Sequence, residues 1–272
     1  MKSKITGGDT TLLFTKKVLN NYDVRYYKCN QTGFIQTDEP YWLPEAYSSA
    51  ISKLDVGLVS RNLNLSDRVG KLLKVKFNYK GVFLDYAGGY GLFARLMRDK
   101  GFNFYSTDKY CQNLFAENFD LINLPQDVNF ELVTAFEVFE HLSDPIEEIK
   151  EILKFSKNLL FSTELLPRQL TNINTWWYLS PETGQHISFY NFESLSFIAN
   201  KLGYNFYTDG SFLHLFSKQL FDKDILIPTR ENYLLRKAKK FVKKAEERKY
   251  GAQESLVMTD WQYIKDKLRS NS

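Results

Sequence analysis

The strongest constraint on this chain is a glycine-rich segment that directly follows a short apolar run. The run occupies residues 81–86, and the segment AGGYG follows it at residues 87–91. Apolar residues then recur at helical spacing over residues 89–100. Glycine adopts positive φ angles freely and lets the backbone approach a ligand closely. A strand, a glycine turn and a helix in this order indicate a parallel α/β sheet whose ligand lies at the carboxyl ends of the strands.

The middle of the chain continues the alternation of strands and helices. Further strands are expected at residues 102–107, 131–136 and 158–162, and further helices at residues 110–118, 144–153 and 192–202. The last two strands, at residues 204–207 and 212–217, surround the dipeptide Asp209-Gly210, which favours a hairpin. We therefore predict a doubly wound, Rossmann-like α/β sheet that is mostly parallel and ends in an antiparallel hairpin.

The regions on either side of this alternation differ from it in composition. Residues 1–78 are rich in aromatic side chains and are expected to form a cap, with a hairpin at residues 24–28 and 33–37 and a helix near residues 48–62. Residues 79–218 are expected to form the ligand-binding domain. Residues 219–272 are expected to form a basic, helical tail.

Positive charge is concentrated in that tail. The chain has 272 residues and a net charge of +4, but residues 230–249 alone carry nine basic and three acidic side chains, a local charge of +6. The remainder of the chain is therefore slightly acidic, which makes nucleic acid an unlikely partner of its main body. The apolar residues of the tail recur at helical spacing. Packing on the domain, contact with an anionic membrane surface and binding of nucleic acid all remain open for it, in that order of preference.

The sequence also bears on the cellular compartment. No apolar run approaches the roughly 20 residues that span a bilayer, and the first residues lack the apolar core of a signal peptide. Cys29 and Cys111 lie far apart, which argues against a disulfide framework and a thiolate zinc site. We expect a cytoplasmic protein, with peripheral contact at the inner membrane face through residues 230–249 as an open alternative.

Two acidic residues close the first two strands. Asp85 ends the first and Asp108 the second, where a carboxylate can accept hydrogen bonds from ribose hydroxyls. Residues 89–94 also fit the dinucleotide pattern G-x-G-x-x-A, with an acid about 20 residues on. A carboxylate at the end of the first strand, however, disfavours a pyrophosphate and suits a ligand with a cationic amine. A nicotinamide-dependent oxidoreductase therefore remains the alternative to an enzyme that binds a cationic ligand.

The segment LDYAGGYG at residues 84–91 resembles the first motif of class I S-adenosylmethionine-dependent methyltransferases. Ala87 stands where that motif usually has its first glycine, and Gly89 and Gly91 match the other two. Asp108 matches the acid that binds the ribose in this family. S-adenosylmethionine carries an ammonium and a sulfonium and no phosphate, which agrees with the charge argument at Asp85.

Two later segments resemble the same family. FEVFEHLSDP at residues 136–145 resembles the stretch after the fourth strand of small-molecule methyltransferases, and HISFYNFESL at residues 186–195 resembles the stretch after the fifth. The resemblance covers about residues 81–217 and implies S-adenosylmethionine as the cofactor. The expected cofactor-binding residues are Asp85, Ala87, Gly89, Gly91, Asp108, Lys109 and Phe136.

A looser resemblance bears on the acceptor. Residues 42–47 and 55–58, together with residues 254–263, are similar to a bacterial subgroup often encoded with glycan or secondary-metabolite pathways. This implies a small-molecule or saccharide acceptor. Aromatic residues at 41–47 and 176–178 are candidates either for the wall of its pocket or for ordinary packing.

Three side chains are candidate catalytic groups, namely His186, His141 and Glu137. Methyl transfer to a hydroxyl requires removal of a proton, and histidine suits a general base near neutral pH. His214 lies inside a predicted strand, so a structural role is expected for it.

Glu137, Glu140 and His141 also fall on one helical turn, and with His186 they form a candidate divalent-metal site of mixed oxygen and nitrogen ligands. The pattern resembles metal-assisted O-methyltransferases, including those that act on ubiquinone precursors and on RNA 3′ ends. A metal site, a metal-free histidine base and a purely structural role stay open at this point. A binding module that has lost catalysis is a further alternative.

Overall fold

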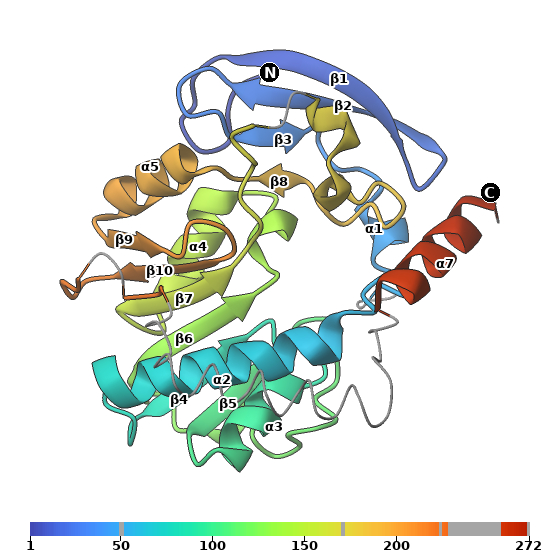
Figure 1. Ribbon diagram of the computed structural model, residues 1–272. Coiled ribbons are helices and arrows are strands. Elements are labelled where there is room, and N and C mark those ends of the chain that lie inside the picture. The colour runs from blue at the N-terminus through green and yellow to red at the C-terminus, as the bar shows by residue number, and fades with distance from the viewer. Residues whose placement is uncertain (49–51, 170–171, 223–224, 228–256, 271–272) are drawn as a thin grey trace, which may run out of the picture.

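The structure is a computed structural model that describes residues 1–48, 52–169, 172–222, 225–227 and 257–270 (Figure 1). Within these residues, six strands form the central sheet in the order β5-β4-β6-β7-β10-β9. Their bounds are Val82–Tyr86 for β4, Asn103–Thr107 for β5, Phe130–Phe136 for β6, Asn158–Ser162 for β7, Asn205–Thr208 for β9 and Leu213–Ser217 for β10. Strands β4 to β7 run parallel, and β10 is antiparallel to both β7 and β9.

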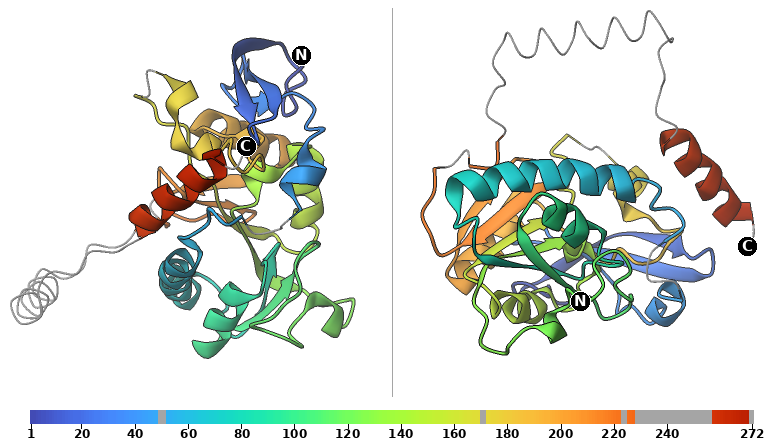
Figure 2. Two further views of the ribbon diagram at one scale, coloured as in Figure 1. Left: turned by 90° about the vertical axis from the view of Figure 1, so that its right-hand side faces the viewer. Right: turned by 90° about the horizontal axis from the view of Figure 1, so that it is seen from below.

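The central sheet carries apolar side chains on both faces, so helices pack against both faces. Along β4, Phe83 and Leu84 belong to different core clusters because successive side chains point to opposite faces. Helices α2 (Leu58–Lys76) and α3 (Leu92–Asp99) pack on the face of Phe83, whereas α4 (Pro145–Leu153) and α5 (Phe192–Leu202) pack on the other (Figure 2). The predicted doubly wound α/β fold is therefore confirmed.

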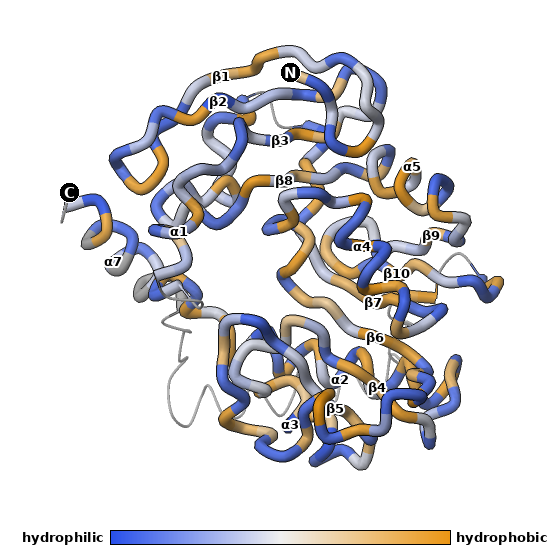
Figure 3. The backbone as a smooth tube through the Cα atoms, turned by 180° about the vertical axis from the view of Figure 1, so that it is seen from behind, coloured by the Kyte–Doolittle hydropathy of each residue, from blue (hydrophilic) through white to orange (hydrophobic). Residues whose placement is uncertain are grey.

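A second, antiparallel sheet of the described chain lies above the first. Its order is β1-β2-β3-β8, with bounds Thr10–Val18, Tyr22–Cys29, Ile35–Thr37 and Ser188–Phe189. Because β8 comes from the chain after β7, this sheet joins the N-terminal region to the loops of the central sheet. A third apolar cluster, which includes Trp42 and Trp176, fills the space between this sheet, α1 (Leu43–Ala46) and the 3-10 turns at Ile173–Thr175 and Trp177–Leu179. Figure 3 shows the two sheets from behind, with hydrophobic stretches along β4 and β6.

Most of the expected elements of the middle region are present, but the helix expected at residues 110–118 is wrong, and the helix expected near residues 48–62 in the N-terminal region is only partly confirmed. Residues 110–118 contain no helix, because the Asp108 carboxylate accepts the amides of Tyr110 and Cys111, and Asn113 hydrogen-bonds Ala116 through both its amide groups. Such local side-chain bonds compete with helical ones. In the described part of residues 48–62, only the residues from Leu58 onwards are helical.

The two ends of the chain differ from expectation in other ways. The hairpin of β2 and β3 is confirmed, but β1 was not expected, because its sequence TTLLFTKKV does not alternate regularly. The basic stretch at residues 230–249 lies outside the described residues. The C-terminal helix α7 spans Val257–Ser270. None of the helices that could be assessed in the described chain has the length and apolar character of a membrane span.

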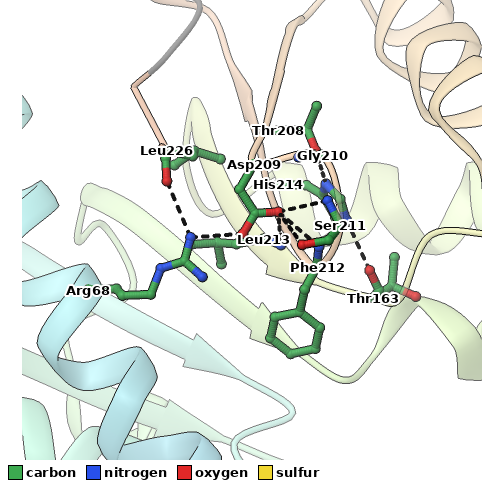
Figure 4. Close-up of polar contacts among 10 residues, drawn as sticks. All are labelled: Arg68, Thr163, Thr208, Asp209, Gly210, Ser211, Phe212, Leu213, His214 and Leu226. Carbon is green, nitrogen blue, oxygen red and sulfur yellow. Dashed lines mark hydrogen bonds and ion pairs between the residues drawn. The ribbon is translucent and has the colours of Figure 1, made fainter. Parts of the chain in front are cut away.

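An ion pair ties α2 to the loop between β9 and β10 (Figure 4). Arg68 Nη2 donates to Asp209 Oδ2 at 2.8 Å and to the Leu226 carbonyl at 3.2 Å. Asp209 Oδ1 accepts the backbone amides of residues 211, 212 and 213. Burial alone would raise the pKa of Asp209, but these hydrogen bonds and Arg68 outweigh it and lower the pKa to about 2. His214, in β10, is fully buried between Thr208 Oγ1 and the Thr163 carbonyl, as a structural role requires.

Replacement of Asp209 by asparagine is expected to cost about 1–3 kcal/mol of stability at neutral pH, because the charged acceptor is lost. The folded-state pKa is the lower one, so the stabilisation is present above about pH 4 and is lost as the pH falls towards about pH 2. Urea unfolding of both proteins across this range measures it, with the exposed Asp222→Asn as the control. A difference that does not shrink at the acidic end would contradict this assignment.

Candidate active site

The carboxyl ends of β4, β5 and β6 open into a cavity of about 1140 Å³. The turns after these strands form one side of it, and the N-terminal end of α2 and the loop at residues 180–186 form another. Pockets that bind one drug-sized ligand have volumes of about 300–1,000 Å³. The cavity therefore has room for two ligands side by side, and its position is the one expected for a doubly wound sheet.

The turn after β4 has a backbone that few residues tolerate. Ala87, Gly89 and Gly91 all have positive φ, at 54°, 58° and 80°. A side chain at Gly91 would collide with Asn113 Oδ1, and one at Gly88 would collide with Asp85 Oδ2 and Ser106 Oγ. Ala87 occupies a left-handed conformation with the smallest possible side chain, at a cost of about 1–2 kcal/mol. The backbone of the turn thus lies directly against Asp85 and Ser106.

Asp85 is a buried carboxyl group with a single described hydrogen bond. The side chain belongs to a residue only 2% exposed, and Thr134 Oγ1 donates to its Oδ1 at 2.6 Å. Burial raises the pKa of Asp85 to about 7, more than the Thr134 bond lowers it. The nearby Ser106 Oγ is buried and has no hydrogen-bond partner among the described residues. A ligand that brings a cationic donor group to this place would satisfy both side chains.

Asp108 holds the turn after β5 in place. Its Oδ2 accepts the Gly89 amide at 2.9 Å, and its Oδ1 accepts the amides of Tyr110 and Cys111 at 2.7 and 2.8 Å. The carboxylate therefore links the two turns and keeps spare lone pairs for a ligand. Lys109 lines the same side of the cavity, and so does Phe136 at the end of β6.

Three of the four candidate metal ligands come together behind the opposite wall. Ligand atoms of Glu140, His141 and His186 all lie within 4.8 Å of one another. Glu140 and His141 belong to the 3-10 turn Phe139–His141, and His186 comes from the loop before β8. The two histidines line the cavity, whereas Glu140 lies behind them and is 0% exposed.

Hydrogen bonds fix the tautomers of both histidines. Nδ1 of His186 lies 2.7 Å from the Tyr178 carbonyl, and Nδ1 of His141 lies 3.1 Å from the Gln185 carbonyl and 3.0 Å from Tyr47 Oη. A carbonyl only accepts, so Nδ1 carries the proton in each ring and Nε2 keeps its lone pair. Burial lowers the pKa of His141 to about 3 and also lowers that of His186. Both shifts favour the neutral form of the ring.

Glu140 is an unusual buried carboxyl group. Burial raises its pKa to about 7, although the hydroxyls of Tyr178 and Thr163 and the charge of Arg61 lower it in part. Neither of its oxygens has a partner with hydrogen-bond geometry in the described part of the chain. Buried carboxylates are normally paired or bound to metal. A proton on Glu140 or a nearby cation would compensate this carboxyl group.

Glu137 has a separate place. Its φ is 54°, its amide donates to Ser162 Oγ at 2.8 Å, and Ser162 Oγ donates back to its Oε1 at 2.9 Å. Burial and the neighbouring Glu140 raise the pKa of Glu137 to about 7. Its carboxyl group lines the cavity but lies outside the cluster of Glu140 and the two histidines.

Other cavity residues were not singled out from the sequence. Arg61 of α2 forms a bidentate pair with Asp55, at 3.0 and 2.7 Å, and its charge reaches Glu137 and Glu140. The two residues are six positions apart across an irregular turn, so no local pattern marks them. Among the aromatic candidates, Tyr47 and Trp177 line the cavity, whereas Trp42 packs in the core.

A family model described as a methyltransferase domain matches residues 60–208. This chain belongs to that family. The family is one of methyltransferases, so the alternative of a nicotinamide-dependent oxidoreductase is set aside. No curated protein matches the chain.

Solved structures with a related fold include other methyltransferases. An O-methyltransferase family 2 protein from Planctomyces limnophilus DSM 3776, in complex with apigenin, is 16% identical, with 65% of each chain covered and a TM-score of 0.45. Magnesium protoporphyrin IX methyltransferase from Synechocystis PCC 6803, with bound SAH, is 15% identical, with 66% of this chain and 98% of that chain covered and a TM-score of 0.43. The chain thus spans slightly less than two thirds of the first of these relatives.

Replacement of Asp85 by asparagine is expected to stabilise the unliganded protein at high pH. The folded-state pKa is raised, so wild-type stability falls between about pH 4 and about pH 7 as the buried group ionises. One pKa unit corresponds to about 1.4 kcal/mol, so a rise from 3.8 to about 7 corresponds to a gain on the order of 4 kcal/mol above that range. Urea unfolding at several pH values measures the difference, with the exposed Asp23→Asn as the control. A less stable Asp85→Asn variant at about pH 8 would count against a desolvated carboxylate.

Proposed function

We propose that the protein transfers a methyl group from S-adenosylmethionine to a hydroxyl group of a small molecule, a sugar or a glycan conjugate. One observation carries this proposal. The glycine turn with its buried acid and the two histidines with free Nε2 atoms border the same cavity, from opposite sides. A donor held at the turn and an acceptor held near the histidines would then lie within reach of each other.

The residues at the glycine turn fit the donor. Its ammonium would meet Asp85, and its ribose hydroxyls would meet Asp108, with Ala87, Gly89 and Gly91 allowing close approach. Lys109 and Phe136 would border the rest of the molecule. When bound, S-adenosylmethionine supplies a methyl group that its sulfonium already activates. The work left to the chain is alignment and removal of the acceptor proton.

His186 is the better candidate for the base. Its Nδ1 proton is held by the Tyr178 carbonyl, so Nε2 is free to accept a proton, and Glu137 lies near enough to stabilise the resulting charge. His141 has the same arrangement, but its pKa of about 3 makes it a weaker base. General bases of this kind contribute about 10²–10⁴-fold to rate.

Glu140, His141 and His186 also fit a divalent metal ion, and we propose this ion as the alternative to a His186 base, because a metal-bound Nε2 of His186 has no lone pair left to accept a proton. Two neutral imidazoles and one carboxylate make a mixed ligand set, and a cation would compensate the unpartnered Glu140 oxygens. When bound, the ion would supply a positive charge that favours the ionised form of an acceptor hydroxyl. Glu137 is bonded to Ser162 and would remain outside the ligand set.

The remaining assignments are part of the same proposal. The apolar and aromatic residues of the cavity, including Tyr47 stacked on Tyr110 with ring centroids 5.1 Å apart, suit a planar or sugar acceptor. The resemblance to a glycan- or secondary-metabolite-linked subgroup agrees with this. The domain limits at residues 78 and 218 and a cytoplasmic location, with or without membrane contact, remain predictions.

Two variants test the histidine cluster. His186→Ala is expected to lower kcat by about 10²-fold or more while S-adenosylhomocysteine binding stays unchanged in calorimetry.

Glu140→Gln is expected to weaken binding of Mn²⁺ or Zn²⁺, each titrated alone, by at least tenfold relative to the wild type. The exposed Glu147→Gln serves as the control. Equal metal binding by the wild type and Glu140→Gln would remove the metal from the proposal and leave His186 as a metal-free base.

A further inference from the structure

Helix α7, far from the other cavity residues in sequence, lies at the mouth of the cavity. In Figures 1 and 2 it is found beyond the N-terminal end of α2, next to the turns at residues 173–179. Met258 and Trp261 of this helix line the cavity. At its other end, the Leu268 carbonyl accepts a hydrogen bond from Asn20 Nδ2 at 3.1 Å.

A buried carboxylate anchors the helix. The Glu182 side chain is only 3% exposed, and its Oε1 accepts from Arg269 Nη2 at 2.6 Å and Nε at 2.9 Å. Lys265 Nζ lies 3.5 Å from the same oxygen. Lys16, which donates to the Asn174 carbonyl, is close enough for the charges of Glu182, Lys265 and Arg269 to affect its pKa. A buried charge is expensive without partners, and α7 provides two of those that surround Glu182.

The anchor also positions an aromatic ring. Lys265 Nζ lies 4.4 Å from the centroid of the Trp261 ring, in a cation–π contact. The same lysine therefore joins Glu182 to the ring that borders the cavity. Loss of the Glu182 charge would release both the helix and the ring.

The anchor belongs to the loop that also carries the candidate base. Glu182 lies between the cavity residues Ser180 and Thr183, four positions before His186. This loop is itself held firmly, because the Pro181 carbonyl accepts the Leu19 amide and the Gly184 carbonyl accepts Trp42 Nε1, both at 2.8 Å. Helix α7 is thus fixed to the histidine side of the cavity and not to the glycine turn.

We propose that α7 forms the outer wall of the acceptor half of the cavity, with Trp261 as a residue that contacts the acceptor and limits its size. Glu182 is the positioning residue that holds this wall through Arg269 and Lys265. The specificity role of Trp261 rests on the proposed methyl transfer. The docking of α7 through Glu182 does not, so the two can be tested separately.

Docking is tested by tryptophan fluorescence on the full chain. Of the four tryptophans, Trp42 and Trp176 are buried and Trp177 is 56% exposed, so Trp177→Phe leaves Trp261 as the partly accessible one. In that background, Glu182→Gln and Arg269→Gln are each expected to raise acrylamide quenching about twofold as the helix opens. Glu151→Gln, which breaks an exposed pair with Lys154, is the control. Quenching that does not change in either anchor variant would overturn the docking.

The specificity role is tested with methyl-labelled S-adenosylmethionine and a low-molecular-weight extract of the producing cells. Trp261→Ala and Glu182→Gln are expected to label larger acceptors that the wild type leaves unlabelled, while S-adenosylhomocysteine binding in calorimetry stays within about twofold. An identical set of products at identical relative rates would overturn the role of Trp261. Failure of the wild type to bind S-adenosylhomocysteine would refute the proposed function instead, and the quenching result would still decide the docking of α7.

Discussion

Burial of carboxyl groups at the carboxyl ends of parallel strands is the constraint on which the site depends. Asp85 near the end of β4 and Glu137 just after β6 both have pKa values that burial raises to about 7, and so has Glu140 three residues further on. A well-packed sheet has no need of such groups, since each destabilises the unliganded protein when it ionises. Cationic ligands that bind these buried carboxyl groups would offset the loss of stability that their ionisation causes. Natural proteins commonly retain local destabilisation of this kind at sites of function.

Backbone strain occurs at the same places. The non-glycine residues Ala87 and Glu137 both have a φ of 54°, and each lies directly after a central strand, at a turn that borders the cavity. At Glu137 the turn is fixed by the closed pair of hydrogen bonds with Ser162 of β7. The turn at Ala87 is fixed by the hydrogen bond that the Gly89 amide donates to the Asp108 carboxylate. A neighbouring strand, or the turn that follows it, thus supplies the bonds that hold each strained turn.

Much of the fold could be predicted from sequence, because local patterns determine it. The buried strands β4, β6 and β7 are short apolar runs, and α5 has a capping box at Asn191 and a C-terminal Gly203 with a φ of 73°. Where contacts between distant parts of the chain determine the local structure, the prediction from sequence was wrong or incomplete. The stretch at residues 110–118 is held as a turn by Asp108 and Asn113, and β8 pairs with β3 across about 150 positions of sequence.

The same distinction applies to the site. The glycine turn and its two acids lie in continuous motifs, and so do Glu140 and His141, so their residue types could be identified in advance. The sequence could not predict that Glu137 lies apart from Glu140 and the two histidines, because its position depends on the Ser162 hydroxyl of β7. The position of α7 could not be predicted either, since contacts distant in sequence hold this helix, among them those of Glu182 with Lys265 and Arg269.

Calorimetric titration of S-adenosylhomocysteine into the wild type and Asp85→Asn is the most direct measurement of whether the carboxylate under the glycine turn receives a cationic amino group. We expect the wild type to bind and the isosteric variant to bind at least tenfold more weakly, a difference of about 1.4 kcal/mol. NAD should bind neither protein. Equal affinity of the two proteins for S-adenosylhomocysteine, or tighter binding of NAD by the wild type, would contradict this role of Asp85.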